Sequence, residues 1–194
     1  MATGSLDRRT AVAALLKDRG GLLVVTGLGS ASYDVMAAGD HDHNFYLWGA
    51  MGSAATVGFG LAMAQRSRPV LVLTGDGEML MGFGALASIA QKLPPNLTIA
   101  VLDNGHYGET GMQTSHTGRG VELSSVAAAC NFPITTCIRD MAAVVELRDR
   151  IHAKSGTTLA TLKIMADESP RVLPPRDGAY VKNRFRSALA FKTI

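Results

Sequence analysis

The strongest constraint on the fold of this chain is a series of short, continuously apolar runs that alternate with segments of helical periodicity. The apolar runs lie within residues 20–27, 69–74, 97–104 and 157–165. Apolar residues at helical spacing mark residues 10–19, 82–93 and 141–154. Strands that are apolar throughout are typical of parallel sheets that helices cover on both sides. The pattern therefore predicts an α/β fold, with an open, mostly parallel sheet and helices on both faces.

The same alternation predicts where a ligand would bind. We expect residues 1–170 to form one domain, followed by a C-terminal tail at 171–194, because no repeat or linker interrupts the pattern. In open α/β sheets, ligands bind at the carboxyl ends of the strands. Three loops follow such ends, namely "TGLGSAS" (26–32), "GDG" (75–77) and "DNGHYGETG" (103–111).

Composition excludes several other classes of protein. The 194 residues carry a formal net charge of +3 without a basic stripe that aromatic residues interrupt, so nucleic-acid binding is not indicated. No apolar stretch reaches the ~20 residues that span a bilayer, and we expect no membrane contact and a cytoplasmic protein. Two cysteines, Cys130 and Cys137, are too few for a metal cluster. We expect them to be buried free thiols in a reducing compartment.

The segment Gly75-Asp76-Gly77 places a carboxylate directly after an apolar run, and three interpretations are open. It is a turn in which Asp76 caps the next helix, or a dinucleotide-binding loop in which Asp103 contacts a ribose. In the second case Asp76 would repel the diphosphate by about 4 kcal/mol at ~4 Å and a surface-like dielectric. The third interpretation removes this repulsion, because Mg2+ bound by Asp76 would attract the phosphate oxygens.

A magnesium site needs a second oxygen ligand at the same edge of the sheet. Asn104 meets this requirement, because it ends the next predicted strand after one helical crossover. The loop after Asn104 can add a backbone carbonyl. The sequence thus favours a metal-and-phosphate site formed by two neighbouring strand ends.

The two motifs together, "GDG" and then "DN" one crossover later, resemble the signature of thiamine diphosphate-dependent enzymes in their diphosphate-binding domain. The segment "LWGAMGSA" (47–54) is similar to the family's contact with the aminopyrimidine ring. The resemblance covers residues from about 20 to 165. Along residues 75–111 it is strongest to the β subunits of sulfopyruvate decarboxylase and the matching domain of phosphonopyruvate decarboxylase.

This resemblance implies a set of binding residues. Mg2+ would be held by Asp76, Asn104 and the carbonyl of His106. The Gly49 carbonyl would accept a hydrogen bond from the 4′-amino group, and Met51 would wedge between the two cofactor rings. The residues implied in thiamine diphosphate binding are Gly27, Gly49, Met51, Gly75, Asp76, Gly77, Glu78, Asn104, His106 and Tyr107.

One residue departs from the family pattern. Glu78 stands where these decarboxylases usually carry serine or another small residue, which argues against a direct diphosphate contact from its side chain. Loop 105–120 is polar and glycine-rich, and it offers Tyr107, Glu109 and His116 as candidates for substrate contact.

The resemblance also implies a partner. Thiamine catalysis needs a glutamate beside N1′ of the pyrimidine, and in this family that residue belongs to a pyrimidine-binding domain. We therefore expect a partner subunit in an α2β2 heteromer or a multiple of it, together acting as a lyase that decarboxylates a small 2-oxo acid. Cations that recognise an acid substituent on the substrate could also come from the partner.

Four alternatives stay open. The chain could belong to a carboligase of the acetolactate synthase type, which joins the carbanion to a second carbonyl. A ferredoxin-linked oxidoreductase subunit is less favoured, because two isolated cysteines cannot bind an iron–sulfur cluster. A nicotinamide-binding module and a purely structural subunit are the remaining alternatives. Intact Asp76 and Asn104 argue against the last of these.

Overall fold

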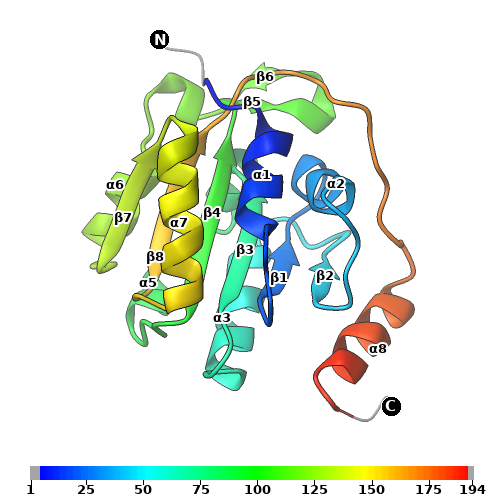
Figure 1. Ribbon diagram of the computed structural model, residues 1–194. Helices are drawn as coiled ribbons and strands as arrows, with labels where there is room; N and C mark the ends of the chain where they lie inside the picture. Colours follow the sequence, from blue (N-terminus) through cyan, green and yellow to red (C-terminus); the bar gives the residue numbers. More distant parts are fainter. Residues whose placement is uncertain (1–4, 192–194) are drawn as a thin grey trace.

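A computed structural model describes residues 5–191, and its main feature is a six-stranded sheet in the order β2-β1-β3-β4-β8-β7 (Figure 1). All neighbouring strands in this sheet are parallel. The strands are β1 (Leu23–Thr26), β2 (Asn44–Tyr46), β3 (Val70–Gly75), β4 (Leu97–Asp103), β7 (Ile134–Ile138) and β8 (Thr158–Lys163). The predicted open, parallel α/β sheet is confirmed.

Helices cover both faces of the sheet, as predicted. They are α1 (Arg8–Leu16), α2 (Ser30–Ala37), α3 (Ala54–Ala64), α4 (Asp76–Met81), α5 (Ala85–Ala90), α6 (Leu123–Ala129), α7 (Met141–Ala153) and α8 (Gly178–Ala188). Buried side chains of α1, α2 and α7 join one core cluster, and those of α3, α5 and α6 join a second cluster on the opposite face. Local caps fix two helix starts, because Asp7 accepts from the Thr10 amide and Asp140 from the Ala143 amide.

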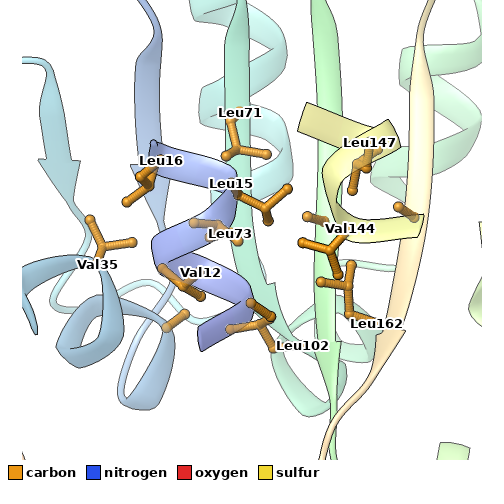
Figure 2. Close-up of a cluster of buried hydrophobic side chains, with 14 of the residues drawn as sticks. Val12, Leu15, Leu16, Val35, Leu71, Leu73, Leu102, Val144, Leu147 and Leu162 are labelled. Carbon is orange, nitrogen blue, oxygen red and sulfur yellow. The ribbon is translucent and has the colours of Figure 1, made fainter. Parts of the chain in front are cut away.

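Strand β3 shows why the central strands of this sheet are apolar along their whole length. Leu71 and Leu73 point toward α1 and belong to the same core cluster as Leu15 of that helix (Figure 2). Their neighbours Val70 and Val72 belong to the cluster on the opposite face. Both sides of the strand are therefore removed from water, and alternation with polar residues would place a polar side chain in one of the two cores.

Element boundaries differ from the sequence prediction in three places. Helix α1 ends at Leu16, although apolar spacing suggested a helix over 10–19. Within the helix expected over 82–93, only Ala85–Ala90 are helical, as α5, and a separate short helix, α4, precedes them from Asp76 to Met81. The GDG segment is thus a strand end running directly into a helix rather than a separate turn.

Loop 105–120 has some structure of its own. It contains a small antiparallel hairpin of β5 (His106–Tyr107) and β6 (Gln113–Thr114), together with the short 3-10 helices η1 (Gly108–Thr110) and η2 (Thr117–Arg119). Figure 1 shows this hairpin above the carboxyl end of the sheet. The loop is therefore held over the edge at which a ligand was predicted to bind.

After β8 the chain crosses the carboxyl edge of the sheet and descends to α8 beside β2 (Figure 1). Phe185 of α8 packs edge-on against Phe45 of β2, with ring centroids 5.4 Å apart. Arg184 donates to Asp40 at 2.6 Å. Helix α8 was not predicted from the sequence, and its contacts join the C-terminal residues to the domain.

Two further expectations can be compared with the structure. Cys130 and Cys137 are free, but Cys137 is exposed on the edge strand β7 and Cys130 is half-buried, so the expectation of buried thiols was wrong. Within residues 5–191, no helix is long and apolar enough to cross a bilayer.

Candidate functional site

A cavity of about 250 Å³ opens at the carboxyl ends of β3 and β4. Its lining includes the GDG segment, the start of loop 105–120 and the beginning of the α2 segment. Of the residues implied in cofactor binding, all except Gly27 and Gly49 line this cavity. The three loops selected from the sequence therefore meet, because β1, β3 and β4 are neighbours in the sheet.

Asp76 lies at the floor of the site, where β3 ends and α4 begins, and only 2% of its surface is exposed. Its Oδ2 accepts hydrogen bonds from Ser115 at 2.5 Å and Thr117 at 2.8 Å. Burial raises the pKa of Asp76 above its ordinary value, although the two hydroxyl groups lower it in part. Among the described residues it forms no ion pair, so a buried carboxylate faces the cavity without a cation.

A second carboxylate lies close to the first. Asp103 ends β4, and its Oδ1 lies 2.8 Å from the same Thr117 hydroxyl that contacts Asp76. Lys163 at the end of β8 neutralises Asp103 with a contact of 2.6 Å. Asp103 therefore has its own cation, whereas Asp76 does not, and the nearby negative charge raises the pKa of Asp76 further.

Asn104 and His106 form a tight turn directly after β4. Gly105 between them has a φ of +72°, which favours glycine at this position. The Asn104 Oδ1 accepts from the His106 amide at 2.9 Å, and a carboxamide oxygen keeps a second lone pair for a further partner. Among residues 5–191 no group of three His, Cys, Asp or Glu side chains could hold a metal. Any metal here would depend on one carboxylate, one amide and backbone carbonyls.

Glu78 connects the GDG segment to the loop after β1. Its Oε2 accepts from the Leu28 amide and from the Thr74 hydroxyl, both at 3.0 Å. Burial raises the pKa of Glu78, while these donors lower it in part. Gly27 leaves the space for this carboxylate, because a Cβ at Gly27 would lie 1.6 Å from Oε2. The sequence-based doubt about a direct diphosphate contact is consistent with this arrangement, since the side chain holds two protein loops together.

The candidates from loop 105–120 take different places. Tyr107 and Glu109 line the cavity, whereas His116 is exposed and contacts the Tyr107 hydroxyl at 3.0 Å. A Cβ at Gly77 would lie 2.7 Å from the Tyr107 ring, so the second glycine of GDG permits this close packing. His116 therefore supports Tyr107 rather than facing the cavity.

Met51 also lines the cavity, and it is 42% exposed. The turn that presents it packs against the end of α4, because a Cβ at Gly82 would lie 1.9 Å from the Gly52 carbonyl oxygen. Gly49, two residues earlier, is exposed and lies outside the cavity lining. The aminopyrimidine contact implied for Gly49 would therefore lie outside the cavity that the described residues form.

Comparison with known families identifies the family to which this fold belongs. Residues 27–169 match the family model of the thiamine pyrophosphate enzyme C-terminal TPP binding domain. The chain belongs to the thiamine pyrophosphate enzymes. The matched range contains every strand from β2 to β8 and the loops that carry Asp76 and Asn104.

Several decarboxylases of this thiamine pyrophosphate family are similar to the chain. Phosphonopyruvate decarboxylase of Streptomyces viridochromogenes is 38% identical over 84% of this chain and 41% of its own length. Sulfopyruvate decarboxylase subunit beta of Methanococcus maripaludis is 30% identical over 86% of this chain and 89% of its own. The corresponding subunit of Methanocaldococcus jannaschii is 36% identical over 59% and 60%. The chain thus spans less than half of the Streptomyces protein and most of the Methanococcus subunit.

Solved structures support the thiamine pyrophosphate fold at lower identity. The thiamine diphosphate-dependent 4-hydroxybenzoylformate decarboxylase of Rhodococcus jostii has a TM-score of 0.69 at 19% identity, covering 87% of this chain and 34% of that one. Benzoylformate decarboxylase of Polynucleobacter necessarius has a TM-score of 0.66 at 16% identity, covering 87% and 36%. At these identities the likeness concerns the fold alone.

Sequence reasoning missed the residues that hold the two carboxylates at the cavity. Ser115 and Thr117 hold Asp76, and Lys163 holds Asp103. Hydroxyl residues in "TSHTG" and a lysine at a strand end are weak signals, because such residues are common in loops. Residues 167–169 and Arg171 also line the cavity, although they were assigned to the domain end and the tail.

Proposed function

We propose that this chain is the thiamine diphosphate- and Mg2+-binding subunit of a heteromeric 2-oxo acid decarboxylase of the sulfopyruvate or phosphonopyruvate type. The observation that carries the proposal is Asp76, a buried carboxylate with no cationic partner among the described residues, directed at a cavity at the strand ends. A buried charge needs pairing, and Mg2+ bridging to a diphosphate supplies it.

The residues present fit such a group. Asp76 and Asn104 offer one carboxylate and one amide oxygen, and the His106 carbonyl adds a third oxygen. Magnesium is commonly held by one or two carboxylates together with phosphate oxygens and water, so the absence of a larger acidic cluster in the described chain agrees with this metal. Gly75 and Gly77 have no side chains to obstruct the approach of a diphosphate.

The chemistry divides between cofactor and protein. When bound, thiamine diphosphate would supply the nucleophilic carbon for the 2-oxo carbonyl and a thiazolium ring as the electron sink for decarboxylation. This chain would orient the cofactor through Asp76 and Asn104, and Met51 would fix its ring conformation. Loop 105–120 would limit the access of water to the reacting carbon.

The proposal includes a partner subunit that supplies the acid beside N1′ of the pyrimidine. In this chain the Glu78 Oε2 accepts from the Leu28 amide and the Thr74 hydroxyl, and Glu109 forms an exposed ion pair with Arg171, so the proposal assigns this task to the partner. The relative from Methanococcus maripaludis is named a beta subunit, which supports a heteromer. We propose an assembly with two copies of each subunit, or a multiple of it, in the cytoplasm.

The test is reconstitution. The chain is purified alone and with the subunit that co-purifies from its source, and CO2 release is followed with thiamine diphosphate, Mg2+ and sulfopyruvate, phosphonopyruvate or pyruvate. We expect turnover only in the mixture, with an aldehyde as product. Substantial turnover by the isolated chain would disprove the shared site, and a carboligated product would favour the acetolactate synthase-like alternative.

A further inference from the structure

The segment that follows β8, residues 165–177, forms part of the cavity wall; we call it the strap. Asp167, Glu168, Ser169 and Arg171 of the strap line the same cavity as Asp76. Figure 1 shows the strap crossing the carboxyl edge of the sheet before it turns down to α8. The chain therefore closes its own site with residues that lie far from the GDG segment in the sequence.

Two hydrogen bonds fix the strap on either side of Arg171. The Arg9 guanidinium donates to the Pro170 carbonyl, immediately before Arg171. The Trp48 indole nitrogen donates to the Pro175 carbonyl at 2.7 Å. Both donors belong to the domain, and the strap backbone around Arg171 is consequently held at the cavity.

The backbone around Arg171 is fixed, but its guanidinium group makes only weak contacts. Its side chain is 63% exposed, and it contacts Glu109 with an Nη2–Oε2 distance of 3.3 Å. The guanidinium also lies 5.8 Å from the centre of the Tyr33 ring. Exposed ion pairs contribute little to stability, so another oxyanion can replace the Glu109 carboxylate at small cost.

Arg8, the other arginine in the described lining of the cavity, cannot serve in this way. Its side chain is buried, and its Nε lies 3.1 Å from the fully buried carboxylate of Asp34. Moving Arg8 toward a ligand would reduce the neutralisation of a buried carboxylate, which is unfavourable. No lysine is among the described residues that line the cavity.

The remainder of the cavity is acidic outside the metal position. Glu78, Glu109, Asp167 and Glu168 all line it, and they would repel a substrate that carries an acid group in addition to its 2-oxo acid. A planar guanidinium with several N–H donors matches the oxygens of a sulfonate, phosphonate or carboxylate. Of the two arginines in the described lining, Arg171 is the one whose guanidinium can change partner at small cost.

We propose that Arg171 determines specificity by binding the second acid group of the substrate, and that Glu109 holds the guanidinium until the substrate displaces it. This inference rests on the proposed function, because it assumes a 2-oxo acid in the cavity. The cation that recognises the acid substituent would then belong to this chain rather than to the partner subunit. Recognition of the distal acid then becomes a property of the strap.

Kinetic specificity is the first test. The assembled enzyme is prepared with Arg171→Ala, Arg171→Lys or the control Arg176→Ala, which removes an exposed strap arginine outside the cavity lining. We expect Arg171→Ala to lower kcat/KM for sulfopyruvate and phosphonopyruvate roughly 10- to 100-fold, with a much smaller change for pyruvate. Arg171→Lys should fall between, and Arg176→Ala should match the wild type. An equal loss on all three substrates would overturn the proposal.

A binding measurement separates this proposal from the proposed function. Titration calorimetry of the assembled enzyme with thiamine diphosphate and Mg2+ compares 3-sulfopropanoate, which lacks the 2-oxo group and cannot react, with propanoate. We expect Arg171→Ala to remove the preference for the sulfonate and Glu109→Gln to strengthen it. If the preference survives in Arg171→Ala, the assignment is wrong. If Arg171→Ala loses the preference while the assembled wild-type enzyme releases no CO2 from any of the three 2-oxo acids, the result supports the role of Arg171 and refutes the decarboxylase.

Discussion

The hydroxyl oxygen of Thr117 lies 2.8 Å from Oδ2 of Asp76, so loop 105–120 holds the carboxylate of the GDG segment directly. The same oxygen lies 2.8 Å from Oδ1 of Asp103. A hydroxyl has one proton, and it can donate to only one of the two carboxylates at a time. Lys163 neutralises Asp103, which leaves Asp76 as the position where a cation adds most to the stability of the site.

Removal of the proposed metal ligands should abolish cofactor binding without unfolding the protein. Asp76→Asn and Asn104→Ala each delete an oxygen ligand at a strand end rather than a part of either core cluster. We expect no measurable thiamine diphosphate binding by calorimetry in the presence of Mg2+, with an unchanged far-ultraviolet circular dichroism spectrum. Wild-type cofactor affinity in either variant would refute the assignment.

Thr117→Val should weaken cofactor binding through Asp76 rather than through direct contact. The substitution keeps the shape of the side chain but removes the hydroxyl that orients the carboxylate. We expect a roughly 10- to 100-fold loss of Mg2+-dependent thiamine diphosphate affinity, as is typical when partners of metal ligands are removed. Thr114→Val is the matched control, because Thr114 is exposed in the same loop and contacts neither carboxylate. Equal effects of the two variants would contradict the role of Thr117.

Gly27→Ala should force the Glu78 carboxylate from its position, since the new Cβ would lie 1.6 Å from Oε2. We expect the free energy of unfolding to fall by about 1–3 kcal/mol, as for overpacked buried sites. In a Glu78→Ala background the same substitution should cost less, and urea unfolding of the four proteins gives the coupling energy. Gly21→Ala is the control, because a Cβ there meets no atom within 4 Å. Additive costs would exclude the steric explanation.

Met51 should act through its volume. Met51→Leu keeps an apolar side chain of similar size at the cavity, whereas Met51→Gly removes it. We expect the assembled enzyme to retain most of its kcat/KM with leucine and to lose more than tenfold with glycine, about 1.4 kcal/mol of transition-state stabilisation. Steady-state kinetics at saturating cofactor measures the difference. If glycine is tolerated as well as leucine, Met51 is not a wedge.

Docking of α8 should depend on the charge of Asp40. Burial raises the pKa of Asp40, but hydrogen bonds from Arg184 and Tyr46 outweigh it, and the net pKa lies below the ordinary value of 3.8. The ionised carboxylate therefore stabilises the fold fully above pH 3.8, and this contribution is lost as the pH falls through the lowered pKa.

Asp40→Asn should accordingly reduce the free energy of unfolding by about 1–2 kcal/mol at pH 7, measured with urea. The difference from the wild type should shrink as the pH drops below 3.8. Asp42→Asn is the control, because Asp42 is largely exposed and its oxygen is 3.8 Å from Arg184 Nε. A difference that persists undiminished in acid would show that the charge of Asp40 is not responsible.

The sequence by itself determined the parallel sheet and the edge of the sheet at which the cavity opens. Strands buried on both faces must be apolar throughout, and this signal survives in β3 and β4 without any knowledge of their neighbours. The positions of Asp76 and Asn104 followed from the same pattern, because carboxyl ends of adjacent parallel strands meet at one edge. Short-range signals failed at helix ends, where α4 begins inside the GDG segment.

Only the tertiary structure decided what surrounds Asp76 and what closes the cavity. Thr117 and Lys163 contact the two carboxylates from a loop and a strand that are distant in sequence. Arg171 lies at the cavity because Arg9 and Trp48 hold the strap across the sheet edge. Such contacts depend on which segments share an edge in three dimensions. Hydrophobic periodicity records burial, but it carries no information on the partners of a polar side chain in a loop.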